Sequence, residues 1–376
     1  MKISKFIAKV LIIALLFFTG TYAATAFFKV QYAKSSALPL EPVLQEIQPL
    51  EMPPAAEPVK PAVAPTPAPA PAAPEPTTQL SDEEYAEVAA SLEKIVEDLG
   101  PMEAMVQLEK LMNENPGVLR SCHGLVHKIG HATMDKFNNF SEAMNYQNEI
   151  CGSGYLHGII EEKFAKSTDV FADMVTICEP KNERSCYHGV GHGLMYYTDN
   201  DLPKSIELCE KYTENEAKVG CAEGVFMENF NSNTQLHPTE YLNPENPFYP
   251  CGDQKDIYKA VCYYYAPSYY LSLHKNAYEE ALKWCQSAER GYEAACVKGA
   301  GSRIVKENLG DVEMAEAVCM TQPDLTSQCI DGMVSYYIVN FASLQKGQEM
   351  CDKISDANKS TCLAGIESRK YWYESD

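Results

Sequence analysis

A short sequence motif that contains a cysteine or tyrosine followed by a glycine recurs along the chain, and it constrains the fold more than any other feature. We call this motif the phrase. The clearest copy is Ser185-Cys-Tyr-His-Gly-Val-Gly-His192. The glycines of the successive copies are Gly124, Gly158, Gly189, Gly224, Gly299, Gly332 and Gly365. Most are about 33 residues apart, and the one interval of about twice that length holds a degenerate copy at Cys262-Tyr-Tyr-Tyr265. A period of this length is typical of stacked helical hairpins.

Between the copies, the pattern of apolar residues predicts two alternating kinds of helix. A-type helices end at or near a cysteine and are expected at 141–151, 169–178, 202–211, 277–286, 311–320 and 343–353. B-type helices begin with the phrase and are expected at 118–136, 155–165, 185–197, 219–230, 294–307, 327–341 and 360–372. No stretch shows sustained apolar and polar alternation, so little β-sheet is expected. The predicted fold class is all-α, an α-solenoid of hairpin repeats of about 33 residues.

In repeat length and helix pairing, residues 100–372 resemble the tetratricopeptide class of α-helical hairpin repeats. The signature Trp-Leu-Gly and Pro positions of that class are absent from this chain. The resemblance implies a curved array whose inner surface is made by one helix of each hairpin. It implies nothing about activity.

The chain contains 14 cysteines, and most fall into close pairs that link the end of one helix to the start of the next. The predicted disulfides of this kind are Cys178–Cys186, Cys209–Cys221, Cys251–Cys262, Cys285–Cys296, Cys319–Cys329 and Cys351–Cys362. Cys122 and Cys151 are left over, and we expect them to bridge adjacent hairpins. The alternative, metal-binding or redox cysteines, is disfavoured because the chain contains no Cys-x-x-Cys.

The N-terminal part of the chain predicts export. Lys2, Lys5 and Lys9 precede an uncharged run at 10–28, so residues 1–36 are interpreted as a signal anchor or, alternatively, a cleaved signal peptide. Both interpretations place the remainder outside the cytoplasm, periplasmic or at the cell surface, or secreted if cleavage occurs. An even cysteine count fits that oxidising location.

The domain boundaries follow from composition. Residues 37–79 are rich in Pro and Ala and are predicted to form a disordered linker. Residues 80–376 form the predicted helical repeat domain. It is divided into repeats 118–230 with the candidate site, an insertion at 231–250 and C-terminal repeats at 251–376. The insertion is interpreted either as a lid or binding loop or as a surface decoration.

Histidines occupy equivalent positions in the first repeats. The residues just before the phrase glycines are His123, His157, His188, Glu223, Tyr264, Lys298, Asp331 and Ala364. Four residues later, on the same helix face, stand His127, Glu161, His192, Met227, Ser268, Ser302, Ser335 and Ser368. Five of the 8 histidines in the chain therefore share these positions in three consecutive repeats.

This pattern predicts a metal centre, because imidazoles four residues apart on a helix can bind one ion. The predicted ligands are His123, His127, His157, Glu161, His188 and His192. They could hold one ion, or two ions bridged by Glu161. In architecture only, the arrangement resembles deoxyhypusine hydroxylase, in which His-Glu pairs on stacked helical repeats hold two irons. His131 extends the first row and is interpreted as either a further ligand or a supporting residue.

Imidazole-rich sites suit zinc, iron, copper or nickel, and zinc and iron are the first choices here. The alternatives to a metal centre are a ladder of hydrogen-bonded histidines and a pocket for a polar or anionic ligand. In an enzyme, Glu161, Glu223 or Glu228 would be the catalytic base.

The predicted function is therefore a membrane-anchored, extracytoplasmic repeat protein with a His/Glu metal-binding centre, and a metal-dependent enzyme is one version of it. The alternatives are a non-catalytic, disulfide-stapled scaffold with a protein or peptide partner on its concave surface, and a metal-binding carrier. A formal charge of −21 argues against nucleic acid as a partner.

Overall fold

The computed structural model describes residues 80–179, 183–231 and 238–370, and no strand occurs within these ranges. The α-helices are α2 (Asp82–Leu99), α3 (Pro101–Glu114), α4 (Pro116–Phe137), α5 (Phe140–Met144), α6 (Ile150–Ala165), α7 (Val170–Ile177), α8 (Arg184–Tyr197), α9 (Leu202–Cys209), α10 (Asn215–Asn231), α11 (Asp256–Leu273), α12 (Tyr278–Cys285), α13 (Glu293–Glu307), α14 (Val312–Met320), α15 (Thr326–Phe341), α16 (Leu344–Cys351) and α17 (Asp356–Glu367). Two short 3₁₀ turns, η1 (Cys251–Asp253) and η2 (Pro323–Leu325), precede α11 and α15. The all-helical prediction is confirmed for the described residues.

Side-chain caps fix where several of the short A-type helices begin. Asp169 accepts a hydrogen bond from the backbone N–H of Ala172 at the start of α7, and Asp201 does the same at α9. Asp311 and Ser343 cap α14 and α16 in the same way. Such a cap satisfies one of the backbone donors that a helix start leaves unpaired and contributes about 1 kcal/mol.

Seven disulfides are present, and each joins a predicted pair of cysteines. Six of them link two helices across a short connection, so each staples a hairpin beside its turn. The seventh, Cys122–Cys151, joins α4 to the start of α6. This number of disulfides indicates that the protein folds in an oxidising environment.

The phrase glycines let the B-type helices cross with their backbones in contact. A β-carbon at Gly158 of α6 would overlap the backbone carbonyl of His127 on α4, and one at Gly224 of α10 would overlap that of His188 on α8. Gly332 of α15 faces Lys298 of α13 in the same way. The close backbone approach expected from a repeated glycine is therefore observed, and it brings side chains on neighbouring helices within reach of each other.

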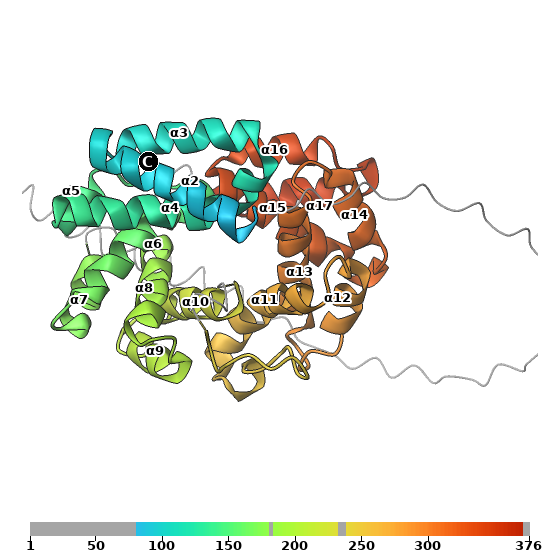
Figure 1. Ribbon diagram of the computed structural model, residues 1–376. Coiled ribbons are helices and arrows are strands. Elements are labelled where there is room, and N and C mark those ends of the chain that lie inside the picture. The colour runs from blue at the N-terminus through green and yellow to red at the C-terminus, as the bar shows by residue number, and fades with distance from the viewer. Residues whose placement is uncertain (1–79, 180–182, 232–237, 371–376) are drawn as a thin grey trace, which may run out of the picture. The chain divides into compact units, whose positions relative to one another are not determined.

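Within residues 72–376, the B-type helices pack against one another in chain order and form a circuit that closes on itself. Each of α4, α6, α8, α10, α11, α13 and α15 packs on the next, and α15 also packs on α6 (Figure 1). A buried contact between the side chains of Cys122 on α4 and Asn340 on α15 lies at this closure. The repeat did not predict this closure. We call the helices of this circuit the inner helices.

The predicted and observed helix boundaries differ in the segment that leads into α6, which carries two of the candidate ligands. The A-type helix expected at 141–151 ends at Met144, and α6 contains three left-handed residues in a row, Cys151, Gly152 and Ser153. The degenerate copy of the phrase, by contrast, lies in the regular helix α11.

Some predictions concern residues that the structure does not describe. The signal anchor or signal peptide at 1–36 and the linker at 37–79 lie outside the described residues, as does part of the insertion at 231–250. Among the described helices, none has the length and apolar character required to span a bilayer. The domain boundaries proposed above stay predictions.

Candidate metal centre

Five imidazoles from three consecutive inner helices meet in one place. We call His123 and His127 of α4, His157 of α6, and His188 and His192 of α8 the histidine cluster. The ring centroid of His157 lies 5.3 Å from those of His123 and His127, 5.1 Å from that of His188 and 4.7 Å from that of His192. The convergence expected from the sequence positions is therefore present in the structure.

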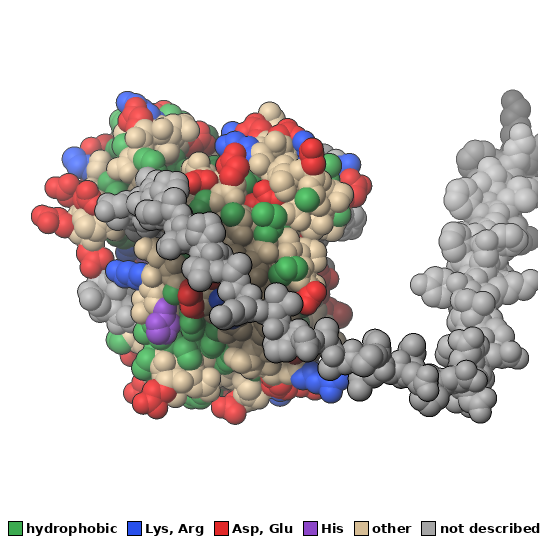
Figure 2. Space-filling model, turned by 90° about the vertical axis from the view of Figure 1, so that its right-hand side faces the viewer, with side chains coloured by type: hydrophobic (Ala, Val, Ile, Leu, Met, Phe, Trp, Pro, Cys, Tyr) green, Lys and Arg blue, Asp and Glu red, His purple; other side chains and the backbone are tan. Residues whose placement is uncertain are grey.

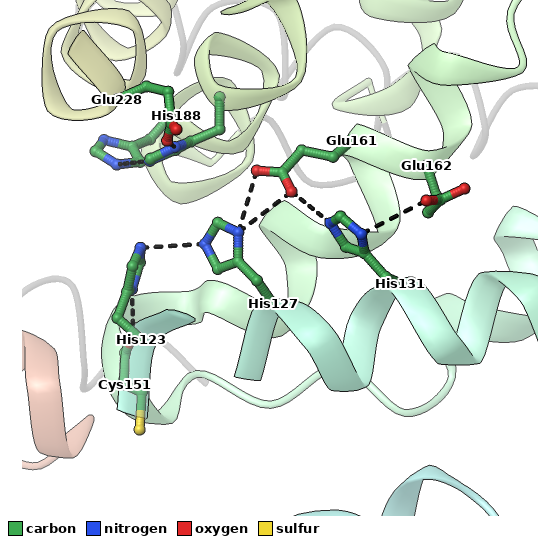
Figure 3. Close-up of polar contacts among 9 residues, drawn as sticks. His123, His127, His131, Cys151, Glu161, Glu162, His188 and Glu228 are labelled. Atoms are coloured by element: carbon green, nitrogen blue, oxygen red, sulfur yellow. Dashed lines mark hydrogen bonds and ion pairs between the residues drawn. The ribbon is translucent and has the colours of Figure 1, made fainter. Parts of the chain in front are cut away.

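The two histidines of α4 point their Nε2 atoms at each other and their Nδ1 atoms outward (Figure 3). The Nε2 atoms are 3.1 Å apart. Nδ1 of His123 lies 2.6 Å from the backbone carbonyl oxygen of Cys151. Nδ1 of His127 lies 3.1 Å from Oε1 of Glu161. A carbonyl and a carboxylate oxygen only accept hydrogen bonds, so both Nδ1 atoms donate.

The two histidines of α8 repeat this arrangement. Their Nε2 atoms are 3.1 Å apart, and Nδ1 of His192 lies 2.8 Å from Oε2 of Glu228. Nδ1 of His188 faces Oε2 of Glu223 at 3.9 Å. Nδ1 of His192 therefore also donates to a carboxylate, which leaves its Nε2 lone pair directed at His188.

These hydrogen bonds make the cluster a fit for a cation. When Nδ1 of an uncharged imidazole carries the proton, Nε2 presents a lone pair. In the α4 pair, two such lone pairs face each other at 3.1 Å, which is unfavourable unless a cation lies between them. Two nitrogens bound to one metal at about 2.0–2.1 Å would be roughly 3 Å apart, which matches the observed separation.

A protonated imidazole is the other cation that could relieve the repulsion, and burial opposes that protonation at His123 and His157. Burial, then the neighbouring His127 and His192, lower the pKa of His123 well below 6.5. Burial and the four surrounding imidazoles lower the pKa of His157 in the same direction. Both rings are therefore held neutral, the form in which imidazole binds a metal.

His157 is the central member of the cluster and has an unsatisfied atom. Its side chain is buried, and its Nδ1 has no hydrogen-bond partner among the described residues. One ring nitrogen each of His123, His157 and His192 lie within 4.8 Å of one another, so one ion could contact three helices. A buried, unpaired polar atom costs about 1–3 kcal/mol, and coordination through Nδ1 of His157 would remove that cost.

Glu161 lies at the edge of the cluster and is shared by two histidines of α4. Its Oε2 is 2.5 Å from Nε2 of His131, whose Nδ1 is 3.5 Å from Glu162 (Figure 3). Burial would raise the pKa of Glu161, but His127 and His131 outweigh it and hold that pKa well below 4.5. Glu161 is therefore an ionised acceptor that orients His127, and it also belongs to two further groups that could hold an ion, with His127 and His131 or with His192 and Glu228.

The predicted catalytic carboxylates all have partners. Glu223 accepts hydrogen bonds from Nε of Arg184 at 2.9 Å and from its Nη2 at 2.8 Å. Burial would raise the pKa of Glu223, but His188 and Arg184 outweigh it and lower that pKa to about 2. Glu161 and Glu228 orient His127 and His192. A role for any of the three as a general base stays a prediction.

Sequence reasoning missed the group that orients His123. The acceptor is a backbone carbonyl, and no residue type marks a carbonyl in a sequence. The only signal was the run Cys151-Gly-Ser-Gly154, because glycines favour the left-handed backbone found there. Arg184, the partner of Glu223, was also missed. His237 of the insertion lies outside the described residues.

Comparisons with known proteins found no match: no protein-family model, no curated protein and no solved structure matches this chain.

Proposed function

We propose that this protein is an extracytoplasmic metalloprotein, built as a closed α-solenoid and tethered by its N-terminal segment, whose histidine cluster binds one divalent transition-metal ion. The tetratricopeptide-like character of the repeats and the membrane anchor are part of this proposal. The residues that would hold the ion are His123, His127, His157, His188 and His192. Zinc and iron are the first choices for such a ligand set, and copper and nickel also suit it.

The observation that carries the proposal is the pair of facing Nε2 atoms on each of two helices, at 3.1 Å in both cases. Hydrogen bonds from Nδ1 to a carbonyl or a carboxylate fix the ring tautomer in three of these four histidines. Metal-binding histidines in proteins almost always have such a partner on the second nitrogen. A purely structural histidine ladder would need one ring of each pair to be protonated on both nitrogens, so that a donor faces an acceptor.

We further propose that the centre is catalytic. When bound, a divalent ion supplies Lewis acidity and lowers the pKa of coordinated water. The chain itself orients the imidazoles through Glu161, Glu223 and Glu228. His123, His127 and His188 are partly exposed, whereas His157 and His192 are buried, so solvent reaches part of the cluster. An accessible side favours turnover, and a ligand shell closed on all sides would favour the carrier alternative.

Elemental analysis tests this proposal. The full chain, purified under oxidising conditions, is expected to contain one equivalent of metal. His157→Ala and His192→Ala should lose it. His274→Ala is the matched control, because His274 contacts Tyr270 and belongs to no metal-binding group among the described residues. A folded, disulfide-bonded protein without stoichiometric metal would overturn the proposal and favour the interaction scaffold.

A further inference from the structure

A second set of ligand atoms lies beside the histidine cluster. Nε2 of His131, one helical turn after His127 on α4, is 2.5 Å from Oε2 of Glu161 on α6. One ligand atom each of Glu161, Glu228 of α10 and His192 lies within 4.8 Å of the other two. Glu161 is therefore close both to an imidazole outside the histidine cluster and to a second carboxylate. We call His131, Glu161 and Glu228 the carboxylate site.

His131 has the orientation of a metal ligand. Its ring lies between two carboxylates, with Nε2 toward Glu161 and Nδ1 3.5 Å from Oε1 of Glu162 (Figure 3). Glu162 is held in turn by Nζ of Lys166 at 3.2 Å. A histidine that binds a metal almost always has such a partner for its second nitrogen. Nε2 of His131 is thus the atom available to an ion.

The two carboxylates of this site differ from the other acids that border the histidine cluster. Glu162 and Glu223 each form an ion pair with a Lys or Arg side chain. Within the described ranges, Glu161 and Glu228 pair only with imidazoles, and their side chains are 8% and 21% exposed. These two acids are also the ones whose ligand atoms lie within 4.8 Å of each other. Like charges this close repel, and a divalent ion between them would neutralise both.

The first ion leaves the carboxylate site free for an ion of its own. The histidine cluster offers five imidazoles, and zinc in a protein is held by about four ligands, so the first ion needs no carboxylate oxygen. One imidazole and two carboxylates form a harder ligand set than five imidazoles, and oxygen-rich sets suit Mn²⁺. In helical proteins, sets of glutamate and histidine hold pairs of iron or manganese ions.

We propose that His131, Glu161 and Glu228 bind a second divalent ion, with Mn²⁺ as the favoured metal, next to the ion in the histidine cluster. This second ion goes beyond the proposed function and rests on it only for the first ion. We expect the second ion to bind more weakly than the first, because fewer side chains hold it. Protein purified without added Mn²⁺ would therefore contain the first ion alone.

A Mn²⁺ titration of the full-length, disulfide-bonded chain, loaded beforehand with one equivalent of Zn²⁺, tests the carboxylate site. Electron paramagnetic resonance of free Mn²⁺ measures how much is bound, and one further equivalent should bind saturably. The chain has a formal charge of −21, and acidic side chains are spread over the face drawn in Figure 2. The titration is therefore done at about 0.15 M salt, which screens weak binding of Mn²⁺ to the surface.

His131→Ala decides the assignment, because His131 is not a member of the histidine cluster. This variant should retain the zinc and raise the Kd for Mn²⁺ about tenfold or more, since loss of a ligand costs at least as much affinity as loss of a supporting partner. His131→Phe, which keeps a ring against Tyr196, should behave in the same way and takes its place if His131→Ala does not fold. His274→Ala is again the matched control and should bind both ions as the native chain does.

The two proposals fail in different ways. Retained zinc without saturable Mn²⁺ binding, or an unchanged Mn²⁺ affinity in the folded His131 variants, would overturn the second ion and leave the first. A native chain that holds no zinc would contradict the proposed function, and the same Mn²⁺ titration of that chain and of its His131 variants would still decide the carboxylate site.

A spectroscopic measurement tests whether the two ions are neighbours. When Co²⁺ replaces Zn²⁺ in the histidine cluster, coupling between the two paramagnetic ions should broaden the signal of bound Mn²⁺. The same signal with Co²⁺ as with Zn²⁺ would place the Mn²⁺ away from the histidine cluster and would overturn the inference.

Discussion

The backbone carbonyl oxygen of Cys151 lies 2.6 Å from Nδ1 of His123, so a half-cystine orients an imidazole of the histidine cluster. The same Cys151 is bonded to Cys122, the residue just before His123. Cys151, Gly152 and Ser153 all have positive φ, a conformation that costs about 1–3 kcal/mol at a non-glycine residue. The disulfide therefore ties this strained turn to the helix that carries two of the candidate ligands.

Removal of this disulfide should weaken metal binding more than removal of any other. In Cys122→Ala/Cys151→Ala, the turn can relax and the carbonyl can leave Nδ1 of His123. Loss of such a supporting partner typically lowers metal affinity by about 10–100-fold. Competition titration with a chromogenic chelator measures the change.

The control for this prediction is Cys351→Ala/Cys362→Ala, which removes a disulfide between α16 and α17, far along the chain from the histidine cluster. Each double variant should lose stability by roughly 2–4 kcal/mol. Only the first should also lose metal affinity. Equal affinities in the two variants would show that the turn does not position His123.

Glu228 provides a second test of the groups that orient the candidate ligands. Its Oε2 accepts a hydrogen bond from Nδ1 of the buried His192 at 2.8 Å. Glu228→Ala removes that acceptor and should reduce metal affinity by about 10–100-fold, with Glu228→Gln reducing it less because its amide oxygen still accepts. Glu216→Ala, an exposed acid on the same helix, is the control. Isothermal calorimetry would rank the four proteins, and equal affinity of Glu228→Ala and Glu216→Ala would contradict the assignment.

The sequence was sufficient to predict the helical class and the disulfides because both follow from spacing. Two cysteines about ten residues apart can form a disulfide only across one helix connection. Once these pairs are assigned, Cys122 and Cys151 remain as partners for each other. The convergence of the five histidines followed from their equivalent positions in three repeats. These are local or periodic properties, and a single sequence records them directly.

Features that depend on the closed circuit of helices were not predictable. The contact of α15 with α6 joins segments far apart in sequence, and no short motif marks it. Arg120 drew no attention, since the burial of its side chain, with Nε unpaired among the described residues, becomes visible only in the folded chain. The role of Glu161 as an acceptor for both His127 and His131 likewise needed side-chain distances.

The close crossing of α4 and α6 predicts an unusual effect of alanine. In an ordinary helix, Gly→Ala increases stability by up to about 1 kcal/mol. At Gly158 a β-carbon would overlap backbone atoms of His127, which cannot move without separating the helices. Gly158→Ala should therefore destabilise the protein by about 1–3 kcal/mol and weaken metal binding.

Gly310 is the control for that prediction, because a β-carbon there meets nothing within 4 Å and its φ is not positive. Gly310→Ala should be neutral or slightly stabilising, since it restricts the unfolded chain. Urea unfolding of both variants measures the difference. A stabilised Gly158→Ala would mean that the helices are not in backbone contact.

A buried carboxylate far from the histidine cluster predicts how stability depends on pH. Glu316 of α14 is 4% exposed and accepts hydrogen bonds from the backbone N–H of Ser355 at 3.0 Å, from the Ser355 hydroxyl, and from Nδ2 of Asn358 at 2.8 Å. Burial would raise the pKa of Glu316, but these hydrogen bonds outweigh it and lower that pKa below 4.5. The carboxylate thereby fixes the start of α17 against α14.

Because the pKa of Glu316 is lower in the folded protein than in the unfolded chain, its contribution is fully present above about pH 4.5 and is lost as the pH falls through the folded value. Glu316→Gln should reduce the free energy of unfolding by about 1–3 kcal/mol at pH 7, since the amide cannot accept all three hydrogen bonds. The difference from the native protein should shrink below about pH 4, where the native carboxyl also becomes protonated. Urea unfolding at several pH values measures it, with Glu313→Gln, exposed on the same helix, as the control. A difference that stays constant down to pH 3 would mean that the charge of Glu316 contributes nothing, because only an ionised group gives a contribution that protonation removes.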